Sequence, residues 1–446
     1  MLVDPVFGDS YASGAIGFHP ARDVDVDAIG PVDAIVITHH HLDHWNAPTV
    51  ARFDRDTTIL VPADDWLVSR LGELGFTKVH AVAPWTRVLL GPVPGTNGGS
   101  PGIELLITPS SADVDELGFV AASGAASYWH MSDTLVDRGV GRRIRDELGP
   151  VSVVASRYLP GESLIAYQRA LGSGRDERDT MVELLEAACE TEPALAFPYF
   201  AGFAFLGEHA WANRWAKPYA PAEIVDLLRR RLGDDARAAE LLPGDVIEIG
   251  GADGRMVRIG RGTSPFVRSR PGDIDAWEPV DTTTLGGLDT DDERDELRAR
   301  LEDWFRATFG PWLQGELRDT TSPWRSLVQW AVVWECVIHL GQNRRLGYQI
   351  DFRTEPIRFS DRGTSPATYG VHLSGRALLD VLRGDAGAEL FWMAGASRTF
   401  EKVIGVQSGQ VVAPPMRGWD LFEACPEPLT HCLRTVGVRD LSHGPA

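Results

Sequence analysis

The stretch Asp33-Ala-Ile-Val-Ile-Thr-His-His-His-Leu-Asp-His-Trp45 determines the fold that we expect for this chain. It begins with an apolar run at 34–37 that is rich in β-branched residues, a pattern that predicts a buried strand. Four histidines and one aspartate follow within six residues. Because imidazoles packed together repel one another once protonated, so dense a cluster at the end of a core strand indicates a metal site.

The spacing of these side chains could divide the metal ligands between two adjacent ions. His39 and His41 are expected to bind one ion, and Asp43 and His44 the other. Asp133 follows a second predicted strand and could bridge the two ions, because one carboxylate carries two oxygens. The alternatives are a degenerate, metal-free relic of such a site and, for Asp133, a turn or helix-capping residue.

Composition and charge limit the classes of protein to which this chain could belong. The chain has 446 residues, which is too long for one ordinary core and predicts two or three domains. Its formal net charge of −20 argues against nucleic acid or an anionic membrane surface as the main partner. Four scattered cysteines indicate a reducing cytoplasm, and the sequence shows neither a signal peptide nor a transmembrane run. We therefore expect a cytoplasmic protein.

The pattern of predicted elements indicates an α/β fold over residues 1–255, which would hold the metal site. Within it, the Asp-rich stretch 14–29 predicts a surface loop. Residues 256–292 are rich in Gly, Pro, Thr and Asp and predict a connecting region. Residues 293–446 predict a smaller α+β C-terminal domain, in which 324–340 is expected to be an apolar helix. This domain could form a lid, a substrate wall or the surface of a homodimer.

Aromatic residues near the predicted metal site are candidates for substrate contacts. Trp45, Trp129 and Phe200 are expected to bind substrate and to shield the site from water. The aromatic loop 202–213 lies where a last metal ligand or a substrate wall is expected, and His209 is the histidine in it. A capping or hydrogen-bonding role for His209 is an equal alternative.

The N-terminal half resembles the metallo-β-lactamase superfamily over about residues 1 to 250. The likeness is carried by Leu2-Val-Asp-Pro5, Val36-Ile-Thr-His39-His-His41-Leu-Asp43-His44 and Ser132-Asp133-Thr134. It implies an αββα sandwich with one or two metals at the edge of the sheets, and the same ligands with Asp133 as the bridge. The sequence departs from the family pattern in lacking two usual histidines, one after Ile107-Thr-Pro-Ser-Ser111 and one near Pro198-Tyr-Phe200.

A narrower likeness is to the metallo-β-lactamase-like part of the CMP-N-acetylneuraminate hydroxylase family. It rests on Leu74-Gly-Phe76, the region around Asn213 and the turn Leu242-Pro-Gly-Asp245. That family is an iron-dependent monooxygenase with its own Rieske domain, so the likeness implies iron. Because this chain has no Rieske motif, electrons would have to come from a separate reductase or ferredoxin.

These observations lead to three functional hypotheses. The first is an oxygenase or oxidoreductase with one or two non-haem irons that acts on a small metabolite, since the missing histidines leave open coordination positions. The second is a zinc hydrolase of an ester, lactone or phosphoester, in which the metal activates water and Asp43 orients that water or accepts a proton. The third is a metal-free binding protein that uses the C-terminal domain.

Overall fold

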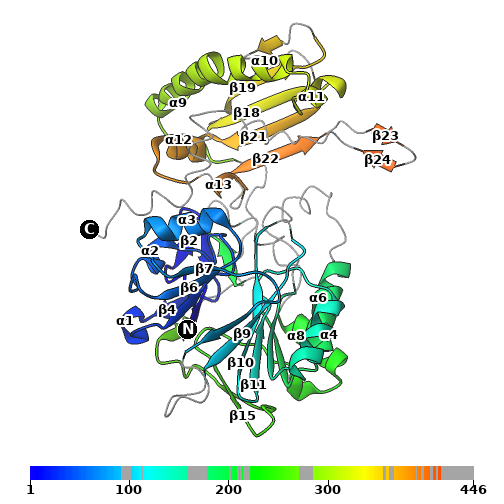
Figure 1. The fold of residues 1–446 in the computed structure, drawn as a ribbon. Helices are drawn as coiled ribbons and strands as arrows, with labels where there is room; N and C mark the ends of the chain where they lie inside the picture. Colours follow the sequence, from blue (N-terminus) through cyan, green and yellow to red (C-terminus); the bar gives the residue numbers. More distant parts are fainter. Residues whose placement is uncertain are drawn as a thin grey trace. The chain divides into compact units, whose positions relative to one another are not determined.

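The chain forms two compact units in the computed structural model (Figure 1). Unit 1 comprises Met1–Tyr11, Gly17–Ala204 and Asn213–Ala276, and unit 2 comprises Ala12–Ile16, Phe205–Ala212 and Trp277–Ala446. The structure describes residues 1–91, 102–112, 114–158, 178–199, 202–207, 210, 213, 221–270, 285–354, 358–360, 366–387, 389–392, 396–401, 405–407 and 410–412.

The first sheet of unit 1 is parallel and has the strand order β1-β5-β6-β7. Its strands are β1 (Leu2–Val3), β5 (Ala34–Val36), β6 (Thr58–Val61) and β7 (Val79–Ala81). Strand β5 is buried on both faces, which explains why its sequence is continuously apolar rather than alternating. One face packs against α2 (Ala47–Val50) and α3 (Asp65–Glu73), and α1 (Val26–Ile29) precedes β5 along the chain.

The second sheet of unit 1 has the order β13-β12-β11-β10-β9-β8. Antiparallel pairing joins β8 (Arg87–Leu90), β9 (Ile103–Thr108), β10 (Gly118–Ser123) and β11 (Ala126–His130). Parallel pairing then adds β12 (Val153–Ser156) and β13 (Leu195–Pro198). Helices α4 (Arg138–Leu148), α6 (Arg178–Glu190) and α8 (Pro221–Leu232) cover its outer face (Figure 1).

An apolar layer between the two sheets completes the sandwich. Val36 and Leu60 of the first sheet pack against Leu105, Ile107 and Phe119 of the second. The layers therefore run helix, sheet, sheet, helix, which confirms the αββα arrangement expected from the sequence.

Residues 256–269 belong to unit 1, which corrects the connecting region expected at 256–292. Strand β15 (Val246–Gly250) forms a hairpin with β16 (Met256–Gly260), and β17 (Val267–Ser269) pairs with β4 (Arg22–Val24). These pairings also add structure to the stretch 14–29, which contains β3 (Ile16–Phe18), β4 and α1 rather than only a surface loop. The remaining small elements are β2 (Ser10–Tyr11) and β14 (Phe203–Phe205), which flank β3, and a short helix at Asp235–Arg237.

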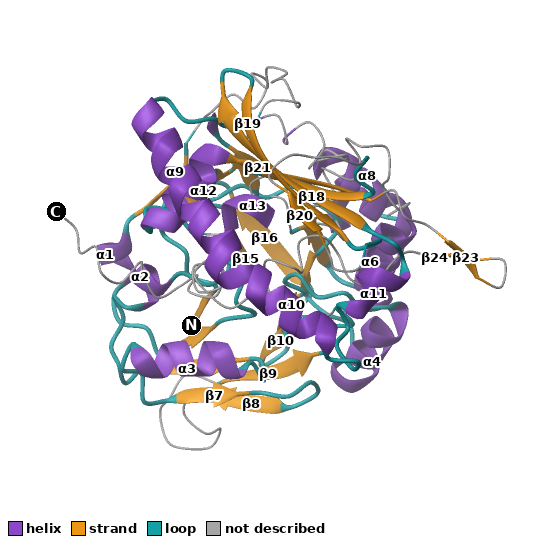
Figure 2. Cartoon of the chain, turned by 90° about the horizontal axis from the view of Figure 1, so that it is seen from above, coloured by secondary structure: helices purple, strands orange, loops and turns teal. Residues whose placement is uncertain are grey.

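Unit 2 contains a five-stranded sheet of order β20-β19-β18-β21-β22. Figure 2 shows α9 and α10 running along this sheet, and Phe309 between these helices stacks on Trp334 of β18. The capping box of Thr290 and Glu293 begins α9. The elements are α9 (Asp291–Trp304), a π-helical turn (Phe305–Phe309), α10 (Gly310–Arg318), α11 (Arg325–Gln329), β18 (Val333–Gly341), β19 (Arg344–Asp351), β20 (Arg358–Ser360), β21 (Tyr369–Ser374), α12 (Gly375–Arg383), α13 (Glu389–Trp392), β22 (Ser397–Glu401), β23 (Gly405–Gln407) and β24 (Gln410–Val412).

The prediction of a helix at 324–340 is wrong. Helix α11 ends at Gln329, and the chain then enters β18, the central strand of the unit 2 sheet. Because β18 pairs with β19 on one side and β21 on the other, its apolar run is that of a buried central strand. Among the helices in the described ranges, none is both long and apolar enough to cross a membrane.

Candidate metal centre

The centre lies where the chain leaves β5. Strands β1 and β5 are parallel neighbours, so the residues that follow them meet at one edge of the sheet. Asp4 follows β1, and its carboxylate accepts hydrogen bonds from the backbone N–H of Thr38 at 2.7 Å and from the Thr38 hydroxyl at 2.8 Å. These bonds anchor the first residue of the histidine-rich loop.

A third segment joins this anchor from the second sheet. Strand β11 ends at His130, and the Ser132 hydroxyl, two residues later, donates to Thr38 Oγ1 at 2.8 Å. Ser132 has a positive φ of 51°, so the chain turns sharply at this residue, immediately before Asp133. The link spans 94 residues of sequence and explains how Asp133 reaches the loop at 39–44.

The first donor group consists of His39, His41 and Asp133, whose potential ligand atoms all lie within 4.8 Å of one another. His39 Nε2 and His41 Nδ1 are 2.9 Å apart. Burial, together with neighbouring histidines, holds the pKa of His39 well below its ordinary value. A neutral imidazole keeps the lone pair that a metal ion requires, so this pair suits coordination.

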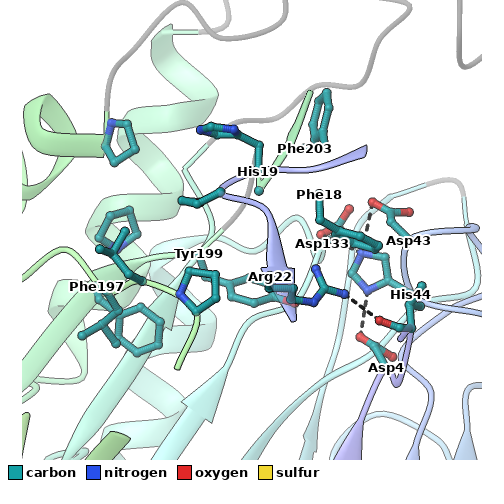
Figure 3. Close-up of a pocket in the computed structure, with 18 of the residues that line it drawn as sticks. Asp4, Phe18, His19, Arg22, Asp43, His44, Asp133, Phe197, Tyr199 and Phe203 are labelled. Carbon is teal, nitrogen blue, oxygen red and sulfur yellow. Dashed lines mark hydrogen bonds and ion pairs between the residues drawn. The ribbon is translucent and has the colours of Figure 1, made fainter. Parts of the chain in front are cut away.

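The second donor group consists of Asp43, His44 and Asp133, again within 4.8 Å (Figure 3). His44 Nε2 lies 3.6 Å from Asp43 Oδ2 and 3.5 Å from Asp133 Oδ1, while His44 Nδ1 lies 2.8 Å from Asp4 Oδ2. Burial by itself lowers the pKa of His44, but the carboxylates of Asp43, Asp133 and Asp4 outweigh it and raise the pKa to about 10. A carboxylate on one ring nitrogen is the usual way to orient a ligating histidine.

A cation fits this arrangement. Three carboxylates surround His44, and burial raises the pKa of Asp43, which marks negative charge that is poorly solvated. Asp133 Oδ1 is buried and has no hydrogen-bond partner within the described part of the chain. Imidazole nitrogens and carboxylate oxygens are the donors that zinc and non-haem iron accept. His39, His41, Asp43, His44 and Asp133 would therefore hold one or two such ions.

His40 and the two tryptophans have other roles. His40 Nδ1 lies 2.7 Å from Asp64 Oδ2, and Asp64 also caps α3, so this histidine is held outside both donor groups. Trp45 and Trp129 are only 2% and 0% exposed and pack in the cores beside the two sheets. Neither lines the cavity next to the centre, so we reassign both from substrate contacts to core residues.

The other two predicted site residues, Phe200 and His209, lie outside the described residues.

A cavity of about 610 Å³ opens onto the second donor group. Asp43, His44 and Asp133 line one part of it, and the other lining residues are mostly aromatic or apolar (Figure 3). They include Phe18, Tyr158, Phe197, Tyr199 and Leu241. This size and lining are those of a site for a small organic molecule.

Several residues of the site were missed by the sequence analysis. Asp4 was noted within Leu2-Val-Asp-Pro5, but only the structure shows that it orients His44. Tyr11 and Arg22 line the cavity from a stretch whose pattern carried no functional signal. His130 also lines it, with Nδ1 3.0 Å from the Tyr128 hydroxyl, and burial lowers its pKa to about 4.

Glu116 lies in the loop before β10, close to the position of one absent family histidine. The Ser110 hydroxyl donates a hydrogen bond to its carboxyl group. Burial raises the pKa of Glu116 to about 7, and the nearby Asp133 charge adds to the shift. Glu116 is not within ligand distance of either donor group, but its charge is coupled to the centre.

The known protein family and relatives described next match the N-terminal region or shorter parts of this chain. The model described as "Beta-lactamase superfamily domain" matches residues 1–161. A "UPF0173 metal-dependent hydrolase" from Polynucleobacter asymbioticus is 27% identical over 150 residues, which cover 30% of this chain and 49% of that protein. A UPF0173 protein from Pyrococcus furiosus is 35% identical over 75 residues, which cover 17% of this chain and 34% of that protein. The chain thus matches half or less of the length of these relatives.

The comparison with solved structures gives two examples, both with low overall similarity. CmlA, a diiron beta-hydroxylase from Streptomyces venezuelae, is 21% identical, with coverage of 58% of this chain and 50% of that chain and a TM-score of 0.36. An isothiocyanate hydrolase from Delia radicum gut bacteria is 15% identical, with coverage of 54% and 88% and a TM-score of 0.34. Similarity this low carries no argument about activity. The family model thus matches residues 1–161, and unit 1, to which these residues belong, has the αββα sandwich of the metallo-β-lactamase fold.

Proposed function

We propose that unit 1 is the catalytic part of a metal-dependent enzyme that acts on a small organic molecule. The observation that carries this proposal is the convergence of two donor groups that share Asp133, the second of which opens onto a cavity. Five side chains from two distant segments supply the donors, and Asp4 from a third segment orients one of them. A purely structural histidine cluster would have no need of an adjacent organic-sized cavity.

Among metal-dependent reactions we favour oxygenation with one or two non-haem irons. Two histidines and one carboxylate, the composition of the first donor group, are the ligand set of many non-haem iron oxygenases and leave positions open. Iron bound there supplies one-electron and O₂ chemistry. An external reductase or ferredoxin would supply electrons, because the sequence has no Rieske motif.

The chain's own residues prepare the site for this chemistry. Asp4 holds the His44 ring so that Nε2 faces Asp43 and Asp133. The ring of Tyr199 packs 4.7 Å from that of His130 and, with Phe18 and Phe197, gives the cavity an aromatic wall. Asp43 lines the cavity, so its carboxylate would bind the metal ion beside the reacting molecule.

The second candidate is hydrolysis with zinc, on an ester, lactone or phosphoester. The Polynucleobacter asymbioticus relative favours it, since that protein is described as a metal-dependent hydrolase. Zinc would lower the pKa of a water molecule, and Asp43 would orient that water or accept its proton. The same five donor residues serve both candidates.

Metal analysis and two activity assays separate the candidates. We would purify the protein without added metal, measure iron and zinc per chain, and test both O₂ consumption with a reductant and hydrolysis of an ester and lactone panel. Iron with reductant-dependent O₂ consumption supports the oxygenase, and zinc with hydrolysis supports the hydrolase. A protein that binds no metal under any condition contradicts the enzyme proposal and leaves the metal-free binding protein.

The matched control for every ligand variant is His40→Ala. His40 lies in the same loop but pairs with Asp64, so its loss should leave the metal content unchanged. His209→Ala tests the last predicted ligand, which lies outside the described residues. The loss of one metal equivalent in this variant would show that His209 replaces an absent family histidine, and unchanged metal content would remove it from the ligand set.

A further inference from the structure

Arg22 is an arginine without a carboxylate partner in the wall of the cavity. It belongs to β4, and one of its guanidinium nitrogens donates a hydrogen bond to the backbone carbonyl of Val6 at 2.6 Å. Its Cζ lies 3.6 Å from the centre of the Phe18 ring. Within the described part of the chain, Arg22 forms no ion pair with an aspartate or glutamate.

Neighbouring acidic residues are already paired with another arginine. Arg270 forms ion pairs with Asp9 at 2.8 Å and with Asp23 at 3.1 Å, and it also hydrogen-bonds the backbone carbonyl of Arg22. The carboxylates of Asp9 and Asp23 are therefore exposed and held by Arg270 rather than by Arg22. In Figure 3 the guanidinium of Arg22 lies instead between Tyr199 and His44, within the cavity.

A half-buried cation without a carboxylate partner is costly, and an anionic ligand would offset that cost. Burial already lowers the pKa of Arg22, which shows that its charge is poorly solvated. A guanidinium carries five N–H donors in a planar fork that matches a carboxylate, and the Val6 carbonyl uses only part of this capacity. The face of Arg22 that looks into the cavity therefore remains available to a ligand.

We propose that Arg22 binds the carboxylate of a small organic acid, whose apolar part lies against Phe18, Tyr158 and Phe197. A single positive side chain matches a single negative charge. The cavity also contains Asp4, Asp43, Asp133 and Glu240, so a dianionic phosphate monoester would meet more repulsion there than a carboxylate. This inference deepens the proposed function and rests on it, because the same cavity would hold the reacting part of the acid beside the donor groups.

The experiment compares an acid with its uncharged analogue. Binding of hydrocinnamate and of hydrocinnamide is measured by calorimetry on the full chain, both loaded with metal and treated with chelator. We expect the wild-type protein to bind the acid at least about tenfold more tightly than the amide, in the range of a charge-assisted bidentate bond. Arg22→Met should remove this preference, and Arg22→Lys should retain part of it because it keeps the charge but not the fork.

The matched control is Arg268→Met, at an exposed position of β17, which pairs with β4. It should leave the preference for the acid unchanged. Circular dichroism and metal content establish that each variant is folded. If Arg22→Met does not fold, the comparison of Arg22→Lys with the wild-type protein decides the question.

Three results would overturn the proposal: no binding of hydrocinnamate to the wild-type protein, equal binding of acid and amide, or an unchanged preference in the Arg22 variants. An acid that binds only to metal-loaded protein, with no effect of Arg22, would be a metal ligand and would also overturn it. If the protein binds no metal, the enzyme proposal fails. An Arg22-dependent preference for the acid in metal-free protein would still support the carboxylate site.

Discussion

The two donor groups share Asp133 but differ in charge and in how they are supported. The first contributes two histidines, of which His39 is kept neutral by burial and has the Thr38 hydroxyl 3.1 Å from its Nδ1. The second contributes two carboxylates around His44, and Asp4 adds a third on the other side of that ring. The first group thus offers neutral nitrogen donors, whereas the second offers concentrated negative charge.

This difference has a consequence for metal binding. In the second group His44 must lose its proton before Nε2 can coordinate, and its pKa of about 10 in the absence of metal opposes that loss. In the first group the histidines are ready to coordinate, but only one carboxylate offsets the charge of the ion. The two positions should therefore respond differently to pH and to substitution, and the following predictions test that difference.

The largest effect is expected for Asp133→Ala, because Asp133 is the only residue common to both groups. Both metal equivalents should be lost together with activity, while the αββα core remains folded. Metal analysis with circular dichroism measures this outcome, with His40→Ala as the control. Retention of both metals would show that the groups are independent and that Asp133 does not bridge them.

The next effect separates the two groups. His41→Ala should remove the metal of the first group and abolish activity, whereas His44→Ala should remove the metal of the second group. Metal stoichiometry and the spectrum of cobalt-substituted protein identify which position is lost in each variant. Full metal content with retained activity in His41→Ala would remove that residue from the ligand set.

A smaller effect is expected for Asp4→Asn, which keeps the size of the side chain but removes its charge. Asp4 orients His44, so the affinity of the second position should fall by about 10–100-fold, the usual cost of losing such a supporting carboxylate. The affinity of the first position should change much less. Competition with a chelator measures both affinities, and an equal loss at both positions would contradict the assignment of Asp4 to the second group.

The smallest effect is expected for Glu116, which lies outside both groups. The negative charge of Asp133 contributes to raising the pKa of Glu116. Its pKa in the folded protein, about 7, exceeds the ordinary value of 4.5, so the folded state binds more protons between these pH values. The contribution of Glu116 to the stability of the metal-free protein should therefore fall as the pH rises from 4.5 to 7, by about 3 kcal/mol. Glu116→Gln cannot ionise and should lack this dependence.

Thermal unfolding of the wild-type protein and of Glu116→Gln in chelator, at pH 5 and pH 8, tests this last prediction. The variant should gain stability relative to the wild-type protein at the higher pH. A difference that is the same at both pH values would show that Glu116 ionises normally and is not coupled to the centre.

The histidine-rich loop could be predicted from sequence because its signal is local. A buried apolar strand followed by dense histidine and aspartate strongly indicates metal ligands, and the structure places 39, 41, 43 and 44 together beside Asp133. Local sequence patterns gave wrong predictions where tertiary contacts determine the secondary structure. The run at 324–340 is apolar enough for a helix, but its second half pairs with strands on both sides and forms β18.

The roles of single aromatic and charged residues depended on burial, which a linear pattern does not show. Trp45 and Trp129 are near the ligands in sequence, yet their side chains turn into the cores. Arg22 and Tyr11 lie in or beside an Asp-rich stretch without periodicity, yet both line the cavity.

By itself, the sequence indicated the metallo-β-lactamase type of fold through its resemblance to that superfamily. Residue chemistry and short-range spacing also identified the ligand candidates and predicted their division between two ions. Only the tertiary structure decided that Asp4 orients His44, that His40 is excluded, and that Arg22 faces the cavity. These roles arise from contacts between segments far apart in the chain. The parallel pairing of β1 with β5 places Asp4, the ion pair with Asp64 holds His40, and the pairing of β4 with β17 positions Arg22, none of which a local pattern encodes.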